Sequence, residues 1–197
     1  MTPEARNATK AEVTFEERGG RAVVVKDYAS RAWWIRTFYG RPTLRREARV
    51  YERLTGVPGV PQSLGLETPD RLVLARAPGQ PSHEVPRGSY DARAVCDALD
   101  AIVAAIHARG VAIGDLHRRN VLIAPPAPVH VIDFALARIA RDPARPGWLV
   151  RRLQDRDRHA AARLRARMLG LPEPEPPGSI GAFYRAGRRF KKIVSGR

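Results

Sequence analysis

Three polar residues, Asp115, Asn120 and Asp133, stand at the edges of two short apolar runs in the middle of the chain. Asn120 follows Asp115 by five positions and Asp133 follows it by eighteen, with VLIA and VHVI between them. The two runs, joined by a Pro-rich turn, are expected to pair as a β-hairpin. Phosphoryl transfer needs one carboxylate to orient the attacking hydroxyl, and an amide and a second carboxylate to hold magnesium. The spacing therefore indicates phosphoryl-transfer chemistry.

The stretch GDLHRRNVLI, followed by IDF, resembles the catalytic and metal-binding segments of the protein-kinase-like superfamily. The loop is similar to that of aminoglycoside and choline-kinase-like phosphotransferases, and the compact layout resembles bacterial lipopolysaccharide-core (Kdo) kinases and RIO-type kinases. The resemblance spans roughly residues 11–140. It implies ATP as phosphoryl donor and Mg²⁺ as metal cofactor, with Asp115 orienting the acceptor and with Asn120 and Asp133 holding magnesium.

Several positions of this segment depart from the protein-kinase pattern. Ile113-Gly114 replaces the usual His-Arg, Ala135 replaces the glycine of D-F-G, and no A-P-E follows. A phosphorylated activation loop therefore has no obvious anchor, and the peptide-docking segment is missing. Arg119, four positions after Asp115, either neutralises the transferring phosphate or is a solvated loop arginine.

Upstream, two β-rich runs predict a second hairpin. Residues 11–17 and 21–28 flank Gly19 and Gly20, which supply the turn. Lys26 ends the second run. The resemblance implies that it grips the α- and β-phosphates, whereas a lysine at a strand end is ordinarily a solvated residue.

A helix over 44–54 is expected next, with Thr43 as its N-cap. Glu47 shares its apolar face, whereas Glu52 points away. A carboxylate on an apolar face is costly unless it is paired. We therefore expect Glu47 to hold Lys26.

The stretch RLVLARAPGQP predicts a strand that ends in a hinge at Pro78 and Gly79. The resemblance implies that Leu74 lies behind the adenine and that the backbones of Ala75 and Ala77 bond its edge.

Two longer helices are expected downstream. Asp91–His107 has one apolar face and stops at Gly110, and a second helix ends at Gly170. His107 is expected to be a structural hydrogen-bonding group rather than a catalyst. Cys96, the single cysteine, is expected to be a buried thiol, and excludes an internal disulfide.

The turn before the first hairpin strand contains no glycine. It reads Asn7-Ala8-Thr9-Lys10, where a Gly-rich loop would cover the nucleotide phosphates. Either a glycine-free turn serves, or nucleotide binding is weak. The second reading supports an alternative function, a catalytically degenerate kinase-like module that binds nucleic acid or anionic lipid.

The formal net charge of +15 over 197 residues predicts attraction to polyanions. The chain is long enough for one compact unit or two small lobes. No apolar run approaches the roughly 18 residues of a membrane span, and no signal peptide is evident. We expect a cytoplasmic monomer, with peripheral attachment to the inner face of the membrane as a further possibility.

Two segments bear on that attachment. Trp33, Trp34, Phe38 and Tyr39 lie among arginines. They form either a short helix packed on the small lobe or an exposed patch for a membrane interface or single-stranded nucleic acid. The segment after Gly178 reads as a basic amphipathic helix, which either lies on an anionic bilayer or docks on the large lobe.

The expected fold is α+β: a minimal two-lobed kinase-like fold. Residues 1–79 would form a small antiparallel-sheet lobe with one helix. Residues 80–197 would form a mostly helical lobe with the catalytic loop and a basic tail. The expected activity is ATP- and Mg-dependent phosphorylation of a hydroxyl. A lipopolysaccharide-type sugar or glycolipid is the favoured acceptor, and a protein Ser/Thr is the other candidate.

Overall fold

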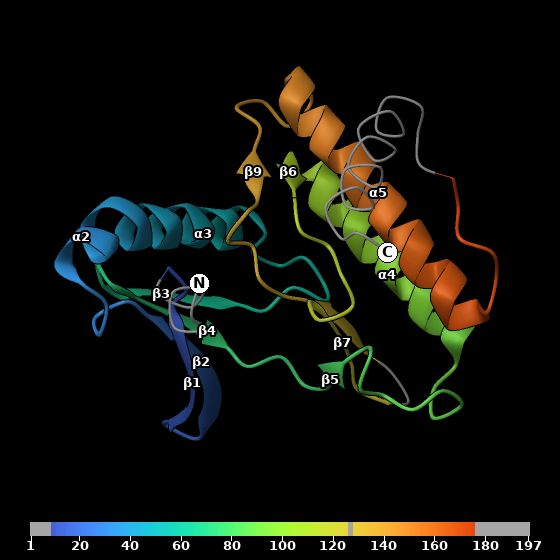
Figure 1. The fold of residues 1–197 in the computed structure, drawn as a ribbon, viewed down its shortest axis with the longest axis horizontal. Coiled ribbons are helices and arrows are strands. Elements are labelled where there is room, and N and C mark those ends of the chain that lie inside the picture. The colour runs from blue at the N-terminus through green and yellow to red at the C-terminus, as the bar shows by residue number, and fades with distance from the viewer. Residues whose placement is uncertain (1–8, 126–127, 176–197) are drawn as a thin grey trace, which may run out of the picture.

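The computed structural model describes residues 9–125 and 128–175. They form an antiparallel sheet with a helix along it, followed by a part dominated by two long helices that lie side by side (Figure 1). The α+β arrangement is as predicted. The predicted basic helix after Gly178 lies outside the described residues, as do Asn7 and Ala8 of the glycine-free turn.

The first sheet has four strands in the order β1-β2-β4-β3, namely β1 Glu12–Arg18, β2 Arg21–Asp27, β3 Ser63–Thr68 and β4 Arg71–Ala75. The predicted hairpin is confirmed, and Gly19 and Gly20 make its turn with positive φ. Val23 and Val25 are buried on one face of β2. Because side chains alternate along a strand, Lys26 faces the opposite side.

One helical segment runs from Trp33 to Arg53. It consists of α2 Trp33–Ile35, the π-helical stretch η1 Arg36–Gly40 and α3 Arg41–Arg53. The predicted Thr43 cap is wrong. Thr43 is buried inside α3, and the helical backbone continues back through Gly40, so no free N-terminal amides remain at 43 for a cap to satisfy. A Cβ on Gly40 would lie 2.7 Å from Cγ of Tyr28, so glycine lets the helix approach the sheet.

The second part holds α4 Ala92–Ala108 and α5 Trp148–Leu169. Asp91 caps α4 by accepting the amides of Arg93 and Ala94, and the predicted helix is confirmed. The second predicted helix does end at Gly170, in a left-handed conformation, and it begins at Trp148. Short strands connect these helices: β5 Gln80–Pro81, β6 Val111–Ala112, β7 Val121–Ile123, β8 Val129–Val131 and β9 Arg138–Ile139.

The predicted hairpin around the catalytic residues is β7 paired antiparallel with β8, and β5 joins its other edge. Val121, Ile123 and Val131 are fully buried and belong to the large apolar cluster that also contains Leu44 and Ile106. This cluster joins α3 of the first part to α4 of the second and so fixes the segments that carry the polar residues. Among the described helices, none has the length and apolar character needed to cross a bilayer.

Candidate active site

Lys26 lies at the centre of a three-residue ionic network. Its Nζ donates to Oε1 of Glu47 at 2.6 Å and to Oδ1 of Asp133 at 2.8 Å. The contact between Lys26 and Glu47 is as predicted, and Glu52 is exposed as expected. The contact between Lys26 and Asp133 joins residues 107 positions apart and was not foreseen. It links the first sheet directly to the segment after β8.

Burial shapes the charges of this network. The side chain of Glu47 is 1% exposed and that of Lys26 is 13% exposed. Burial is the largest influence on Lys26 and opposes its charge, but the carboxylates of Glu47 and Asp133 together raise its pKa above the ordinary value. Asp133 is likewise penalised by burial, yet Lys26 lowers its pKa below the usual range. Burial raises the pKa of Glu47 above its ordinary value, although the ammonium group of Lys26 opposes this rise.

Helix α3 also holds the backbone that follows Asp133. The amide of Phe134 donates to Oε1 of Glu47 at 3.2 Å, and Arg46 donates to the carbonyl of Ala135. The ring of Phe134 is fully buried and meets Tyr51 edge-on at 5.1 Å between centroids. The orientation of Asp133 thus depends on side chains from α3.

Asp133 has a φ of 67°, the one positive φ outside glycine among the described residues. Left-handed backbone is costly for most residues, and aspartate is one of the few that tolerate it. Ala135, which replaces the D-F-G glycine, does not adopt a positive φ. The substitution at 135 therefore costs no backbone strain here.

The loop around Asp115 is held by its backbone. Gly114 has a φ of 81°, and a Cβ there would lie 2.8 Å from the carbonyl oxygen of Leu136, so the position requires glycine. The amides of Ile113 and Gly114 donate to the carboxylate of Asp157 at 2.7 and 2.9 Å. Asp115 itself stays 49% exposed, with His117 Nε2 at 3.6 Å from its Oδ2. Its carboxylate is accessible to an acceptor.

Asp157, buried in the middle of α5, is the principal residue that the sequence analysis missed. Besides the two loop amides, its Oδ2 lies 3.2 Å from Nε2 of His107. The predicted structural role of His107 is confirmed by this contact. Asp157 follows Gln154 by three positions on the buried face of α5. The spacing could have indicated an acidic residue on the buried face of the helix, but the partners of that residue are determined only by the tertiary fold.

Asn120 and Asp133 offer oxygens suited to magnesium. Asn120 donates from Nδ2 to the carbonyl of Asp115 at 3.1 Å, which leaves its Oδ1 as an acceptor. The backbone carbonyl of Asn120 accepts a hydrogen bond from the backbone amide of Ile132 at 2.9 Å, so Asn120 lies beside the residue that precedes Asp133. Oxygen ligands are what Mg²⁺ prefers, together with waters and substrate phosphates. In the described part of the chain no cluster of three or more His, Cys, Asp or Glu forms a complete metal cage.

The residues predicted around the adenine lie on β4 and the segment after it. Leu74 is buried, and its register opposite Val24 places it on the same sheet face as Lys26. Phe15 is also opposite Val24 and is 64% exposed. This face therefore offers an exposed aromatic ring near the predicted base, which the sequence analysis did not single out.

The predicted backbone contacts to adenine are only partly available. The amide of Ala75 is already donated to the carbonyl of Gln62 at 2.8 Å. Ala77 makes no backbone hydrogen bond within the described ranges, so both its N–H and its C=O are open. Gly79 follows with a φ of 101°, and a Cβ there would lie 2.6 Å from the backbone of Ile123. Arg119 is exposed.

No protein-family model and no curated protein matches this sequence. Two solved structures of the Rio2 kinase from Chaetomium thermophilum match the fold. The first, an ADP/Mg²⁺-phosphoaspartate complex, has a TM-score of 0.63 and 17% identity, and the match covers 86% of this chain and 56% of that one. The second has a TM-score of 0.62 and 17% identity, with coverage of 86% and 57%.

This chain spans a little over half the length of those Rio2 structures. At such low identity the similarity concerns the fold: an antiparallel N-terminal sheet with a helix, followed by a helical part. The roles of individual site residues, and the lobe boundary between 79 and 80, stay predictions. The chain has a protein-kinase-like fold.

Proposed function

We propose that this protein is an ATP- and Mg-dependent phosphotransferase that acts on a hydroxyl group. One observation carries the proposal: Lys26 is held at 2.6 Å from Glu47 and 2.8 Å from Asp133, although the three residues come from distant parts of the chain. A buried lysine between two carboxylates is expensive to build for stability alone. It is well suited to hold nucleotide phosphates beside a metal ligand.

In this mechanism Lys26 binds the phosphates and Glu47 fixes its position. Asp115 accepts a hydrogen bond from the acceptor hydroxyl and takes its proton as the oxygen attacks. A bond forms between that oxygen and the γ-phosphorus, the bond to the β–γ bridging oxygen breaks, and ADP leaves. Magnesium, held by Oδ1 of Asn120 and the carboxylate of Asp133, would neutralise phosphate charge.

The Rio2 complex with ADP, Mg²⁺ and phosphoaspartate supports nucleotide and metal as ligands of this fold. It also raises a second candidate reaction, transfer of the phosphoryl group to a carboxylate of the protein itself. The accessible carboxylates here are Asp115 and Asp133, 49% and 44% exposed. A phosphoaspartate is an acyl phosphate, so hydroxylamine would release the label from the protein, whereas a phosphorylated hydroxyl would retain it.

A glycolipid or sugar at an anionic membrane remains the acceptor that we favour. Trp33, Trp34 and Phe38 are 70%, 55% and 74% exposed. The segment is helical, as one reading of the sequence predicted, and it also exposes its aromatic rings, as the other required. Exposed aromatic rings beside arginines suit a membrane interface.

Nucleotide binding tests the proposal directly. Isothermal titration with ADP should show binding that magnesium strengthens, and Asp133→Asn should remove most of the magnesium effect. Incubation with ATP labelled at the γ-phosphate, followed by hydroxylamine, then distinguishes the two acceptors. Absence of nucleotide binding with and without magnesium would overturn the proposal. Salt-dependent binding to single-stranded oligonucleotide or to anionic vesicles would then favour the degenerate module.

A further inference from the structure

A basic pocket opens between the catalytic loop and α5. Its charged lining residues are His117, Arg118, Arg119, Arg163 and Arg167, and its volume is about 320 Å³. Small-molecule sites typically range from about 300 to 1,000 Å³, so this pocket lies at the lower end of that range. The proposed mechanism uses none of these residues.

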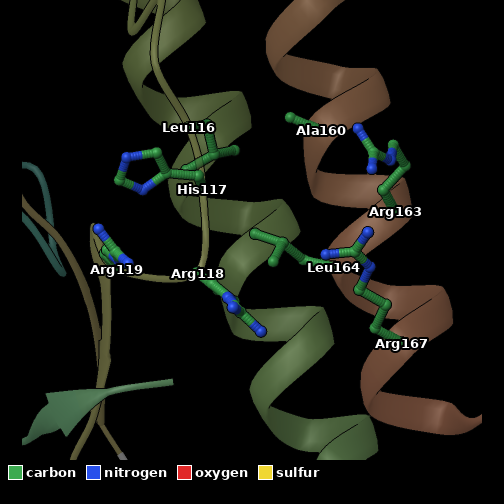
Figure 2. Close-up of a pocket in the computed structure, with 8 residues that line it drawn as sticks. All are labelled: Leu116, His117, Arg118, Arg119, Ala160, Arg163, Leu164 and Arg167. Atoms are coloured by element: carbon green, nitrogen blue, oxygen red, sulfur yellow. The ribbon is translucent and has the colours of Figure 1, made fainter. Parts of the chain in front are cut away.

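The pocket is built from both sides (Figure 2). Arg118 points from the loop toward α5. On α5, the guanidinium group of Arg167 lies beside Leu164, and the side chain of Arg163 runs along the helix toward Ala160. His117 and Arg119 lie on the other side of the loop. His117 also contacts Asp115, with 3.6 Å between Nε2 and Oδ2. The pocket therefore adjoins the predicted acceptor base.

Positive charge in the pocket exceeds the negative charge supplied by the chain. Arginine stays protonated, so four guanidinium groups contribute full charges. Within the described residues, neither Arg118 nor Arg119 has an acidic partner. Residues 176–197 contain no aspartate or glutamate in their sequence.

Glu173 shows what the two helix arginines can bind. Its Oε2 lies 3.3 Å from Nε of Arg163, and its Oε1 lies 2.7 Å from Nε of Arg167. One carboxylate is thus held by two guanidinium groups. Glu173 is 48% exposed and lies in the segment after Gly170, so an incoming anion can compete with it. These two arginines are already arranged to share one anionic group.

We propose that the pocket binds a phosphate group carried by the acceptor, and so presents the acceptor hydroxyl to Asp115. The inference rests on the proposed function and adds a substrate class, a phosphorylated hydroxyl compound. Guanidinium groups bind phosphate in a bidentate fashion. Phosphate has more acceptor oxygens and more charge than the single carboxylate now present, and it matches several converging arginines better.

The test measures binding of inorganic phosphate by isothermal titration, with and without saturating MgADP. Arg167→Gln and Arg163→Gln should each weaken phosphate binding by about tenfold, because each removes charge-assisted hydrogen bonds. Glu173→Gln should strengthen it, because the competing carboxylate is gone. Arg151→Gln is the matched control, an exposed arginine on α5 about 18 Å along the helix axis from Arg163.

Opposite effects of Arg167→Gln and Glu173→Gln, with Arg151→Gln unchanged, would support the inference. Phosphate binding that is absent, or equal in the wild type and all four variants, would overturn it. MgADP binding is measured in parallel. If MgADP fails to bind while the arginine pattern persists, the proposed function fails and the pocket stands. If MgADP binds and the arginine substitutions leave the phosphate affinity unchanged, only this inference fails.

Two arms then separate the sources of the phosphate. Glycerol 3-phosphate, with glycerol as the neutral control, represents a soluble metabolite. Phosphatidate vesicles, with phosphatidylcholine vesicles as control, represent a lipid headgroup. Dependence on Arg167 in the first arm assigns the site to a soluble compound, and dependence in the second alone assigns it to lipid. Dependence in neither arm contradicts the proposal.

Discussion

The two sides of the catalytic loop differ in how their charged side chains are paired. On the Lys26 side, one ammonium is enclosed by two carboxylates, and the Glu47 side chain is 1% exposed. On the α5 side, four arginines and one histidine line a pocket, and the carboxylate of Glu173 engages two of these arginines. In the first region each charged side chain has an oppositely charged partner within the protein. The second region carries excess positive charge.

The paired charges around Lys26 hold the site together, whereas the arginines of the pocket are available to bind a ligand. Removing one partner of a buried pair leaves an uncompensated charge and destabilises the fold. Removing an exposed arginine from a cluster of like charges costs the fold little, because surface ion pairs contribute only about 0–1 kcal/mol. The same kind of substitution should therefore affect stability in one region and binding in the other.

The largest effect is expected at Asp115, which belongs to neither group because its carboxylate is half exposed and loosely paired. Asp115→Asn should reduce turnover by about 10²–10⁴-fold, since that is the contribution of a positioned base. Thermal stability and MgADP binding should stay at wild-type values. The measurement is ATP turnover together with calorimetric nucleotide binding. Turnover at the wild-type rate would remove Asp115 from the mechanism.

Glu47→Ala should disrupt the ionic network around Lys26. It leaves Lys26 buried beside Asp133 alone and removes the acceptor of the Phe134 amide. We expect a loss of about 3 kcal/mol in the free energy of unfolding, with a parallel loss of activity. Denaturant titration provides the measurement. Glu52→Ala, on the exposed face of the same helix, is the control, and equal losses in both variants would contradict the pairing.

Asp157→Asn probes how the loop between the two regions is positioned. The amide side chain keeps one acceptor oxygen, so at least one of the bonds from Ile113 and Gly114 is lost. We expect a cost of about 1.5–3 kcal/mol in stability. The readout specific to positioning is a lower kcat with unchanged MgADP affinity. Asp155→Asn, an exposed neighbour paired with Arg158, should change neither quantity.

Asp70 sharpens the comparison, because it too is shared by two arginines but is only 7% exposed. Hydrogen bonds from Arg41, and then from Arg36, hold the pKa of Asp70 below its ordinary range. A depressed folded pKa adds stability above the unfolded value of about 3.9 and loses it as pH falls. Asp70→Asn should therefore be less stable than wild type by about 1–2 kcal/mol at pH 7.

Denaturant titrations of both proteins between pH 7 and pH 2 provide the check on Asp70. The gap between them should be constant above about pH 5 and should narrow below about pH 4. Glu173→Gln, the exposed counterpart, should show little stability change at any pH. A gap that grows on acidification would contradict the assignment.

Local sequence patterns predicted much of this architecture. The alternating run around Lys26, the Gly19-Gly20 turn and the apolar faces of α3 and α4 each specify one element without reference to the rest. Glu47 could be matched to Lys26 because a lone carboxylate on an apolar helix face demands a partner. The failure at Thr43 has a local cause as well, since a π-helical stretch leads into α3 where a helix start was expected.

Contacts between distant elements could not be predicted in the same way. Asp157 looks like one more charge in a charged helix until the fold places it under the amides of Ile113 and Gly114. Likewise, nothing in the spacing of Arg163 and Arg167 indicates that they face Arg118 across a pocket. Such features depend on how α5 packs against the rest of the protein, and that packing is determined by the whole core rather than by the local sequence.

The contact of 2.8 Å between Lys26 and Asp133 competes with the binding of a phosphate to Lys26 and of a cation to Asp133. A phosphate that takes Nζ of Lys26 frees the Asp133 carboxylate for a cation, and a cation on Asp133 frees Lys26 for a phosphate. The first ligand to bind thus breaks the ion pair between Lys26 and Asp133, and the second ligand no longer has to break it. Thermodynamic linkage makes such coupling reciprocal, commonly about 5–150-fold. Nucleotide and divalent cation should therefore bind as a cooperative pair, with each tightening the other by the same factor.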